Sequence, residues 1–102
     1  MKIYNKLVRD NIPQIIKESG RNCTIKKLND NEYFEYLNEK LKEEIDEYIC
    51  DNDVEELVDI VEIIMSILKT KNISLTEFEK MKNIKKQKRG GFEKKILLIS
   101  ID

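Results

Sequence analysis

The stretch "EEIDEYICDNDVEELVDIVEII", residues 43–64, joins two segments of helical periodicity through the polar turn "DND" at residues 51–53. Before the turn, apolar residues from Phe34 to Tyr48 recur every three or four positions, which predicts a helix over residues 30–50. After the turn, apolar residues cover most of the helical circumference over residues 54–68, which predicts a second, buried helix. A turn this short makes the two helices antiparallel neighbours, so the stretch predicts a helical hairpin.

Capping residues mark where the long helices begin. In each case an oxygen-bearing side chain stands three positions before a glutamate, which is the outline of a capping box. The three pairs are Asn29 and Glu32, Asp53 and Glu56, and Ser74 and Glu77. The last pair predicts a helix that runs to Lys88 and stops before Gly90 and Gly91.

A further short helix is expected near the start of the chain. Asp10 is expected to cap it, so that it begins at Asn11. Pro13 is tolerated in its first turn, and Gly20 ends it.

The rest of the sequence adds short segments and no domain boundary. Residues 23–29, "CTIKKLN", predict a short extended segment or a connector, and residues 94–101, "KKILLISI", predict a strand or an extended tail. With one Pro, three Gly and no repeat or linker, residues 1–102 are expected to form a single domain. A chain that is 38% charged has limited apolar material to bury, so the expected fold is an all-α antiparallel helical bundle completed by dimerisation.

Charge is distributed unevenly along the chain. Residues 1–30 carry a net charge of +4, residues 31–62 of −11 and residues 63–102 of +6. A general nucleic-acid binder needs a continuous basic face, so an acidic centre argues against that class. No apolar stretch is long enough to cross a bilayer, so no membrane partner is expected either. An acidic centre between basic arms suits a divalent cation together with a phosphorylated small molecule.

The cysteines and the first residues bear on location. "MKIYNKLVRDNIP" has no apolar signal core, so a cytoplasmic location is expected. Cys23 and Cys50 are far apart in a chain without His, which argues against a zinc site and gives no reason to infer a disulfide. Both are expected to be reduced, and Cys50 to be a packing residue.

Four carboxylates are predicted to converge on the hairpin. Glu44 interrupts the apolar seam of the first helix, and Glu47 follows one turn later on the same side. Glu56 and Asp59 have the same spacing on the second helix, and the two pairs lie at matching heights from the turn. Four like charges at this separation require protons or a cation. Oxygen ligands without His or Cys favour Mg²⁺, with Mn²⁺ possible, over zinc.

The remaining acids of the stretch have other expected roles. Glu43, Asp46 and Glu55 are expected to face water. Glu62, one turn deeper than Asp59, is left open between a further metal and a partner Arg or Lys from elsewhere.

"EEIDE" followed by "EELVD" resembles the signature of the MazG-like all-α nucleoside triphosphate pyrophosphohydrolases, a superfamily that includes phosphoribosyl-ATP pyrophosphohydrolase. "YNKLVRDNIPQII" and "KQKRGGFEKKILL" resemble one branch of it, so the likeness covers about residues 4–98 in the family's order. Eight residues separate Glu47 from Glu56, fewer than is usual in the family.

The resemblance implies Mg²⁺-dependent hydrolysis of a nucleoside triphosphate between its α and β phosphates, giving a monophosphate and pyrophosphate. Its implied metal ligands are the same four acids that the helix geometry selects. A carboxylate not saturated by metal is expected to accept the proton of the attacking water, with Glu47 or Glu44 as candidates and Glu43 behind them. Basic side chains are expected to hold the phosphates and the leaving group: Lys6, Arg9, Lys85, Lys88 and Arg89.

Three functions remain open from the sequence. The first is a house-cleaning enzyme that removes unwanted nucleotides, acting as a homodimer or a dimer of dimers. The second is phosphoribosyl-ATP pyrophosphohydrolase of histidine biosynthesis. The third is a non-catalytic helical dimer that binds a nucleotide.

Overall fold

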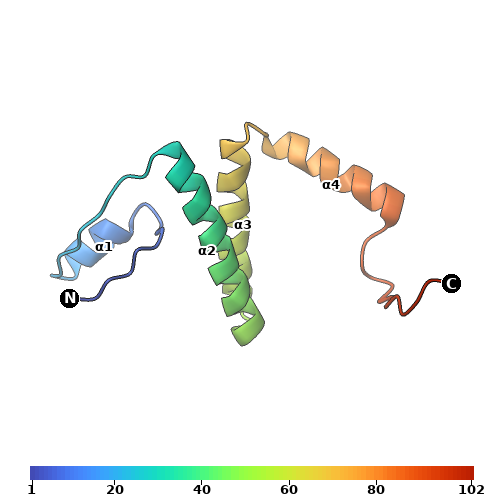
Figure 1. Ribbon diagram of the computed structural model, residues 1–102, viewed down its shortest axis with the longest axis horizontal. Coiled ribbons are helices and arrows are strands. Elements are labelled where there is room, and N and C mark those ends of the chain that lie inside the picture. Colours follow the sequence, from blue (N-terminus) through green and yellow to red (C-terminus); the bar gives the residue numbers. More distant parts are fainter.

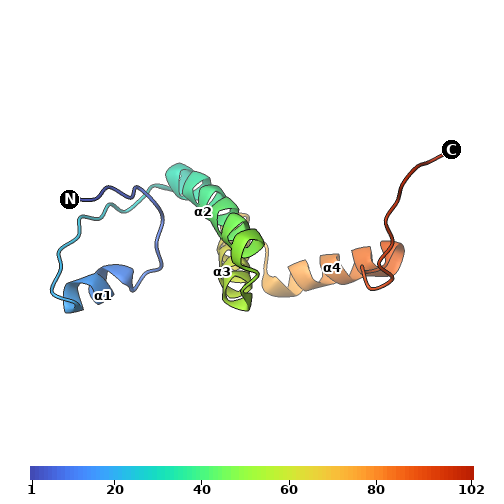
Figure 2. The same ribbon diagram turned by 90° about the horizontal axis from the view of Figure 1, so that it is seen from below.

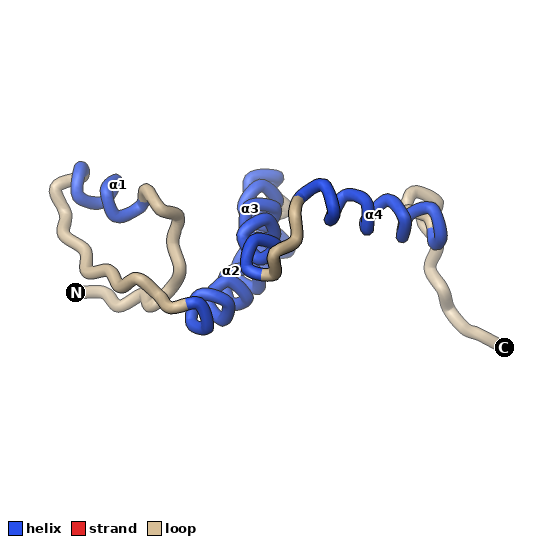
Figure 3. The backbone as a smooth tube through the Cα atoms, turned by 90° about the horizontal axis from the view of Figure 1, so that it is seen from above, coloured by secondary structure: helices blue, strands red, loops and turns tan.

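The computed structural model describes all residues from 1 to 102, which form four helices and no strand. In chain order these are α1 (Ile12–Glu18), α2 (Asp30–Asp51), α3 (Val54–Thr70) and α4 (Leu75–Arg89). The all-α prediction is therefore confirmed. The segments 23–29 and 94–101 contain no strand and run as a connector and a tail (Figure 3).

The long helices begin at the predicted caps. The Asn29 side chain accepts a hydrogen bond from the Glu32 backbone N–H, and the Glu32 carboxylate accepts one from the Asn29 backbone N–H, so the capping box is confirmed. Asp53 caps α3 through the backbone N–H of Glu55, one residue earlier than a capping box requires.

The cap of α4 also differs in detail from a capping box. Ser74 accepts from the Glu77 backbone N–H, and its hydroxyl also donates to the Glu77 carboxylate. The helix ends at Arg89, one residue beyond the predicted end, where Gly90 takes a φ of 83°.

The predicted start of the first helix was wrong. α1 begins at Ile12, and its N-cap is Asn11, whose side chain makes no capping hydrogen bond. Asp10 is one residue too early to cap it, because the helix is entered through a backbone turn in which the Ile12 N–H donates to the Arg9 carbonyl. Gly20 does follow the end of the helix, with a φ of 85°.

Helices α2 and α3 form the antiparallel hairpin that the sequence predicts (Figures 1 and 2). Asn52 closes the turn with a φ of 54°, a left-handed conformation that Asn tolerates better than most residues. Leu37 from α2 and Ile63 and Leu68 from α3 are the buried apolar side chains between them. At the open end, the Lys71 ammonium lies 5.0 Å from the centre of the Phe34 ring.

The single chain is extended and leaves much apolar surface exposed. Its radius of gyration is 18.1 Å, whereas a compact domain of this length has about 13 Å. Helix α4 leads away from the hairpin, and the hairpin contact is the only extensive one between helices (Figure 1).

Two expectations of burial are therefore not met in one chain. Helix α3 was predicted to be buried, but Val54, Val58 and Val61 are exposed because no other helix covers that face. Cys50 was predicted to be a packing residue, but its side chain is exposed near the hairpin turn. Cys23 is also exposed, and neither cysteine forms a disulfide.

None of the four helices has the length and apolarity that a membrane span requires.

Candidate metal centre

Acids from both helices of the hairpin meet around Glu44. One carboxylate oxygen from each of Glu44, Glu56 and Asp59 lies within 4.8 Å of the others. In a second group, one carboxylate oxygen from each of Glu43, Glu44 and Glu47, all on α2, also lies within 4.8 Å of the others. The structure thus brings together all four acids that the sequence proposed as metal ligands, with Glu44 common to both groups, and adds Glu43.

Glu44 is the buried member of this cluster, because it occupies an apolar position in the seam of α2. The residue is only 5% exposed, and its side chain is carried inward with Leu37 between the two helices. One of its carboxylate oxygens, Oε1, lies 3.4 Å from the Lys40 ammonium. The other, Oε2, is buried without a hydrogen-bond partner. A buried carboxylate oxygen in this state is strongly unfavourable unless a proton or a cation satisfies it.

The electrostatics of the cluster show the same need for positive charge. Desolvation, followed by the charges of Glu47 and Glu44, raises the pKa of Glu56 to about 7. The pKa of Glu47 is raised as well, chiefly by the charge of Glu44. Raised pKa values mean that the ionised cluster is unfavourable by itself, and a divalent cation would favour the ionised form instead.

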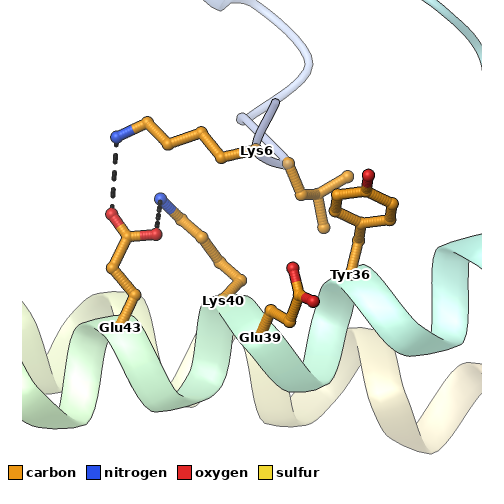
Figure 4. A pocket seen from close by; sticks show the side chains of 6 residues that line it. Lys6, Tyr36, Glu39, Lys40 and Glu43 are labelled. Carbon is orange, nitrogen blue, oxygen red and sulfur yellow. Dashed lines mark hydrogen bonds and ion pairs between the residues drawn. The ribbon is translucent and has the colours of Figure 1, made fainter. Parts of the chain in front are cut away.

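Two of the predicted basic residues reach the acids from the N-terminal segment. Arg9 donates to Asp59 at 2.7 Å, and this hydrogen bond raises the pKa of Arg9, with a smaller contribution from the charge of Glu62. Glu62 makes no ion pair or hydrogen bond with Arg9, so both options for Glu62 stay open. The Lys6 ammonium lies 3.4 Å from Glu43 (Figure 4).

Lys40 was missed in the sequence. Its side chain is 18% exposed and lies 3.5 Å from Glu43 and 3.4 Å from Glu44. Its spacing of four residues before Glu44 is the signal that would have identified it, since residues four apart share a helix face. Figure 4 shows Lys6 and Lys40 converging on Glu43 beside a small hollow. Its lining is formed by Lys6, Leu7, Tyr36, Glu39, Lys40 and Glu43.

The other three predicted basic residues are not brought to the acids within one chain. Lys85, Lys88 and Arg89 lie on the exposed last turns of α4, which leads away from the hairpin (Figure 1). None of them makes an ion pair with an acid of the cluster. Any contact between them and the acids requires a movement of α4 or a second chain.

The donor set fits a hard divalent cation. Every candidate ligand is a carboxylate oxygen, and neither His nor Cys lies among them. Oxygen donors of this kind suit Mg²⁺ and Mn²⁺, and the unpartnered Oε2 of Glu44 supplies a buried donor. Glu44, Glu56 and Asp59 form a group that could hold such an ion, and Glu47 joins Glu44 only in the second group. Lys6, Arg9 and Lys40 lie beside these acids.

Comparisons with known proteins give little further guidance. An uncharacterized protein of Mycolicibacterium smegmatis (strain ATCC 700084 / mc(2)155) is 50% identical over 42 residues, which are 41% of this chain and 43% of that protein. The chain thus matches less than half the length of this curated relative. No protein-family model matches the chain, and no solved structure matches it.

The raised pKa of Glu56 predicts how stability depends on pH in metal-free protein. Between its ordinary pKa of 4.5 and about 7, the folded state retains a proton that the unfolded chain has lost. The stability from this proton is present below pH 4.5 and is lost as pH rises through 7. Thermal unfolding in EDTA should therefore show a lower Tm at about pH 8 than at about pH 5, and Glu56→Gln should reduce the difference. An equal pH dependence in both proteins would contradict this.

Proposed function

We propose that the protein is a Mg²⁺-dependent nucleoside triphosphate pyrophosphohydrolase. It would cleave its substrate between the α and β phosphates and release a monophosphate and pyrophosphate. The observation that carries this proposal is the convergence of carboxylates from two helices on a buried Glu44 whose Oε2 has no partner. The three sequence segments that resemble MazG-like enzymes supply the reaction type.

The acids divide into ligands and a candidate base. Glu44, Glu56 and Asp59 would hold the metal, which when bound would offset phosphate charge and lower the pKa of a water. Glu47 is exposed and makes no ion pair, and its raised pKa makes it a stronger proton acceptor than an ordinary glutamate. Glu43 is a poorer base, because Lys6 and Lys40 both neutralise it. We therefore assign water activation to Glu47.

The basic residues at the rim bind the phosphates. Lys6 and Arg9 are exposed enough to exchange a carboxylate partner for a phosphate oxygen, and their side chains already lie against Glu43 and Asp59. Positive charge held here stabilises the charge that develops on the pyrophosphate leaving group. Lys40 adds a further positive charge beside the phosphates, because its ammonium lies within ion-pair distance of both Glu43 and Glu44.

The proposal includes self-association and a cellular role. The exposed valines of α3 would be covered by a second chain, because a monomer with three buried apolar residues has a very small core. A nucleotide hydrolase of this kind would remove unwanted or excess nucleotides in the cytoplasm.

Product analysis tests the reaction. Purified protein is incubated with each nucleoside triphosphate and with phosphoribosyl-ATP in the presence of Mg²⁺, and the products are resolved by ion-exchange chromatography. Monophosphate and pyrophosphate are expected from a nucleoside triphosphate. Diphosphate and inorganic phosphate would contradict cleavage between the α and β phosphates. Turnover of phosphoribosyl-ATP alone would reassign the substrate, and no turnover at all would favour a non-catalytic metal-binding module.

A further inference from the structure

The two carboxylate oxygens of Glu44 lie in different surroundings. Oε1 forms an ion pair with the Lys40 ammonium at 3.4 Å. Oε2 is buried and has no hydrogen-bond partner. The Glu44 side chain is only 7% exposed, so water gives little compensation for the missing partner. One oxygen of this carboxylate is therefore paired with a cation of the protein itself, and the other still lacks one.

Lys40 is held in place more firmly than the other basic residues beside the acids. It lies on α2 four residues before Glu44, so both side chains share one face of the same helix. Its side chain is 18% exposed, and its ammonium also lies 3.5 Å from Glu43 Oε2 (Figure 4). Arg9, in contrast, reaches Asp59 from the N-terminal segment with 54% of its side chain exposed. Lys40 is thus the basic residue least able to leave its carboxylate.

The number of oxygens that Glu44 offers bears on which divalent cation is bound. Ca²⁺ takes about six to eight oxygen ligands in flexible geometry and accepts both oxygens of one carboxylate. Mg²⁺ requires near-ideal octahedral geometry and usually keeps several waters, so it gains little from a second oxygen of the same carboxylate. A carboxylate restricted to one oxygen therefore disfavours Ca²⁺ more than Mg²⁺.

We infer that Lys40 is a positioning residue that restricts Glu44 to one donor oxygen, Oε2, and so makes the metal centre prefer Mg²⁺ over Ca²⁺. In this role Lys40 acts through Glu44 and touches neither the metal nor the reacting atoms. The inference rests on the metal dependence of the proposed function and not on the hydrolysis itself. It gives a reason why a positive charge lies inside a centre that has to attract cations.

Lys40→Met separates this role from a simple effect of charge. Methionine keeps an unbranched apolar stem that suits a helix, and it removes the ammonium. Loss of a positive charge strengthens the binding of Mg²⁺ and Ca²⁺ alike, because both ions carry the same charge. The released Oε1 helps only the ion that accepts both oxygens. The Kd for Ca²⁺ divided by the Kd for Mg²⁺ should therefore fall about 10-fold, the lower end of the effect of groups that orient metal ligands.

Competition with Mn²⁺ measures the binding of both ions without any turnover. Free Mn²⁺ is followed by EPR as it binds to purified protein, and Mg²⁺ or Ca²⁺ is then added to displace it. The Mn²⁺ binding that Glu44→Gln abolishes defines the site and separates it from the other acids of the chain. Lys42→Met is the matched control, because Lys42 is exposed on the same helix and forms no ion pair with the acids of the cluster. Its Kd ratio should equal that of the wild type.

Lys40→Arg tests whether a positive charge at this position maintains the preference. The guanidinium again stands four residues before Glu44, so the Kd ratio should remain closer to that of the wild type than to that of Lys40→Met. Circular dichroism confirms that each variant keeps its helices. A ratio that falls in Lys40→Met alone supports the inference. An unchanged ratio in Lys40→Met, or an equal fall in Lys42→Met or Lys40→Arg, overturns it.

The outcomes also separate this inference from the proposed hydrolase. A wild type that binds Mn²⁺ at Glu44 without hydrolysing nucleotides contradicts the hydrolase, and the Kd ratio still decides the role of Lys40. A wild type that binds no Mn²⁺ at Glu44 contradicts the metal centre and overturns the inference with it. Hydrolysis by the wild type together with an unchanged ratio in Lys40→Met supports the proposed function and overturns the inference alone.

Discussion

Replacing Glu44 by Gln is expected to reduce nucleoside triphosphate hydrolysis by at least about 100-fold, since even groups that merely support metal ligands contribute 10- to 100-fold. Glu44 is the acid shared by both carboxylate groups and the one with an unpartnered buried oxygen. The amide keeps the shape of the side chain and removes its charge, so the loss would reflect the metal centre. The measurement is kcat/KM for pyrophosphate release at saturating Mg²⁺.

Glu55→Gln is the matched control for that substitution. Glu55 carries the same charge, lies on the first turn of α3 beside Glu56, and is exposed outside both carboxylate groups. Its substitution should change the rate less than about 3-fold, as is usual for exposed positions. If Glu44→Gln and Glu55→Gln lowered kcat/KM equally, general negative charge rather than a ligand set would explain the effect.

Mg²⁺ is expected to raise the Tm of the wild type by about 10 °C or more. An ion at 100 times its Kd stabilises the folded state by about 2.7 kcal/mol. In a chain of this size each kcal/mol corresponds to about 4–8 °C. Part of this gain comes from relief of the desolvation that chiefly raises the pKa of Glu56 and of the repulsion by Glu44 that chiefly raises the pKa of Glu47. Differential scanning calorimetry with and without Mg²⁺ measures the shift.

Asp59→Asn is the variant that should lose this response. Asp59 is a member of the carboxylate group that spans the two helices. Replacing its carboxylate by the Asn amide removes a candidate ligand and leaves Arg9 without its anionic partner. Its Tm should change little between EDTA and Mg²⁺. A full Mg²⁺-dependent shift in Asp59→Asn would place the stabilising ion elsewhere on this acidic chain.

The hairpin and its acids were predictable because they depend on local rules. The position of Glu44 follows from the period of one helix, and its approach to Asp59 follows from a turn of two residues between helices. Lys40 obeys the same local rule, because it lies four residues before Glu44 on the same face of α2. Asp10 failed as a cap because a one-residue shift in the backbone decides which side chain reaches the first free N–H groups.

Contacts between distant segments lay beyond such rules. Arg9 and Asp59 are fifty residues apart, and only the resemblance of "YNKLVRDNIPQII" placed Arg9 among the candidates. The direction of α4 is set by four residues between two helices, and neither spacing nor capping determines it. The exposure of Cys50 has the same origin, because the sequence indicates which face is apolar but not whether another chain covers it.

The N-terminal segment is tied to the hairpin in a way that differs from the hairpin itself. Residues 1–10 contain no helix, and apart from the half-buried Leu7 they are exposed, with Lys6–Glu43 and Arg9–Asp59 as their ion pairs to α2 and α3. Raising ionic strength from 0.1 M to 1 M shortens the Debye length from about 10 Å to about 3 Å and weakens exposed pairs of this kind. Contacts among Leu37, Ile63 and Leu68 are not screened by salt. Concentrated salt should therefore detach this segment while the two helices stay together.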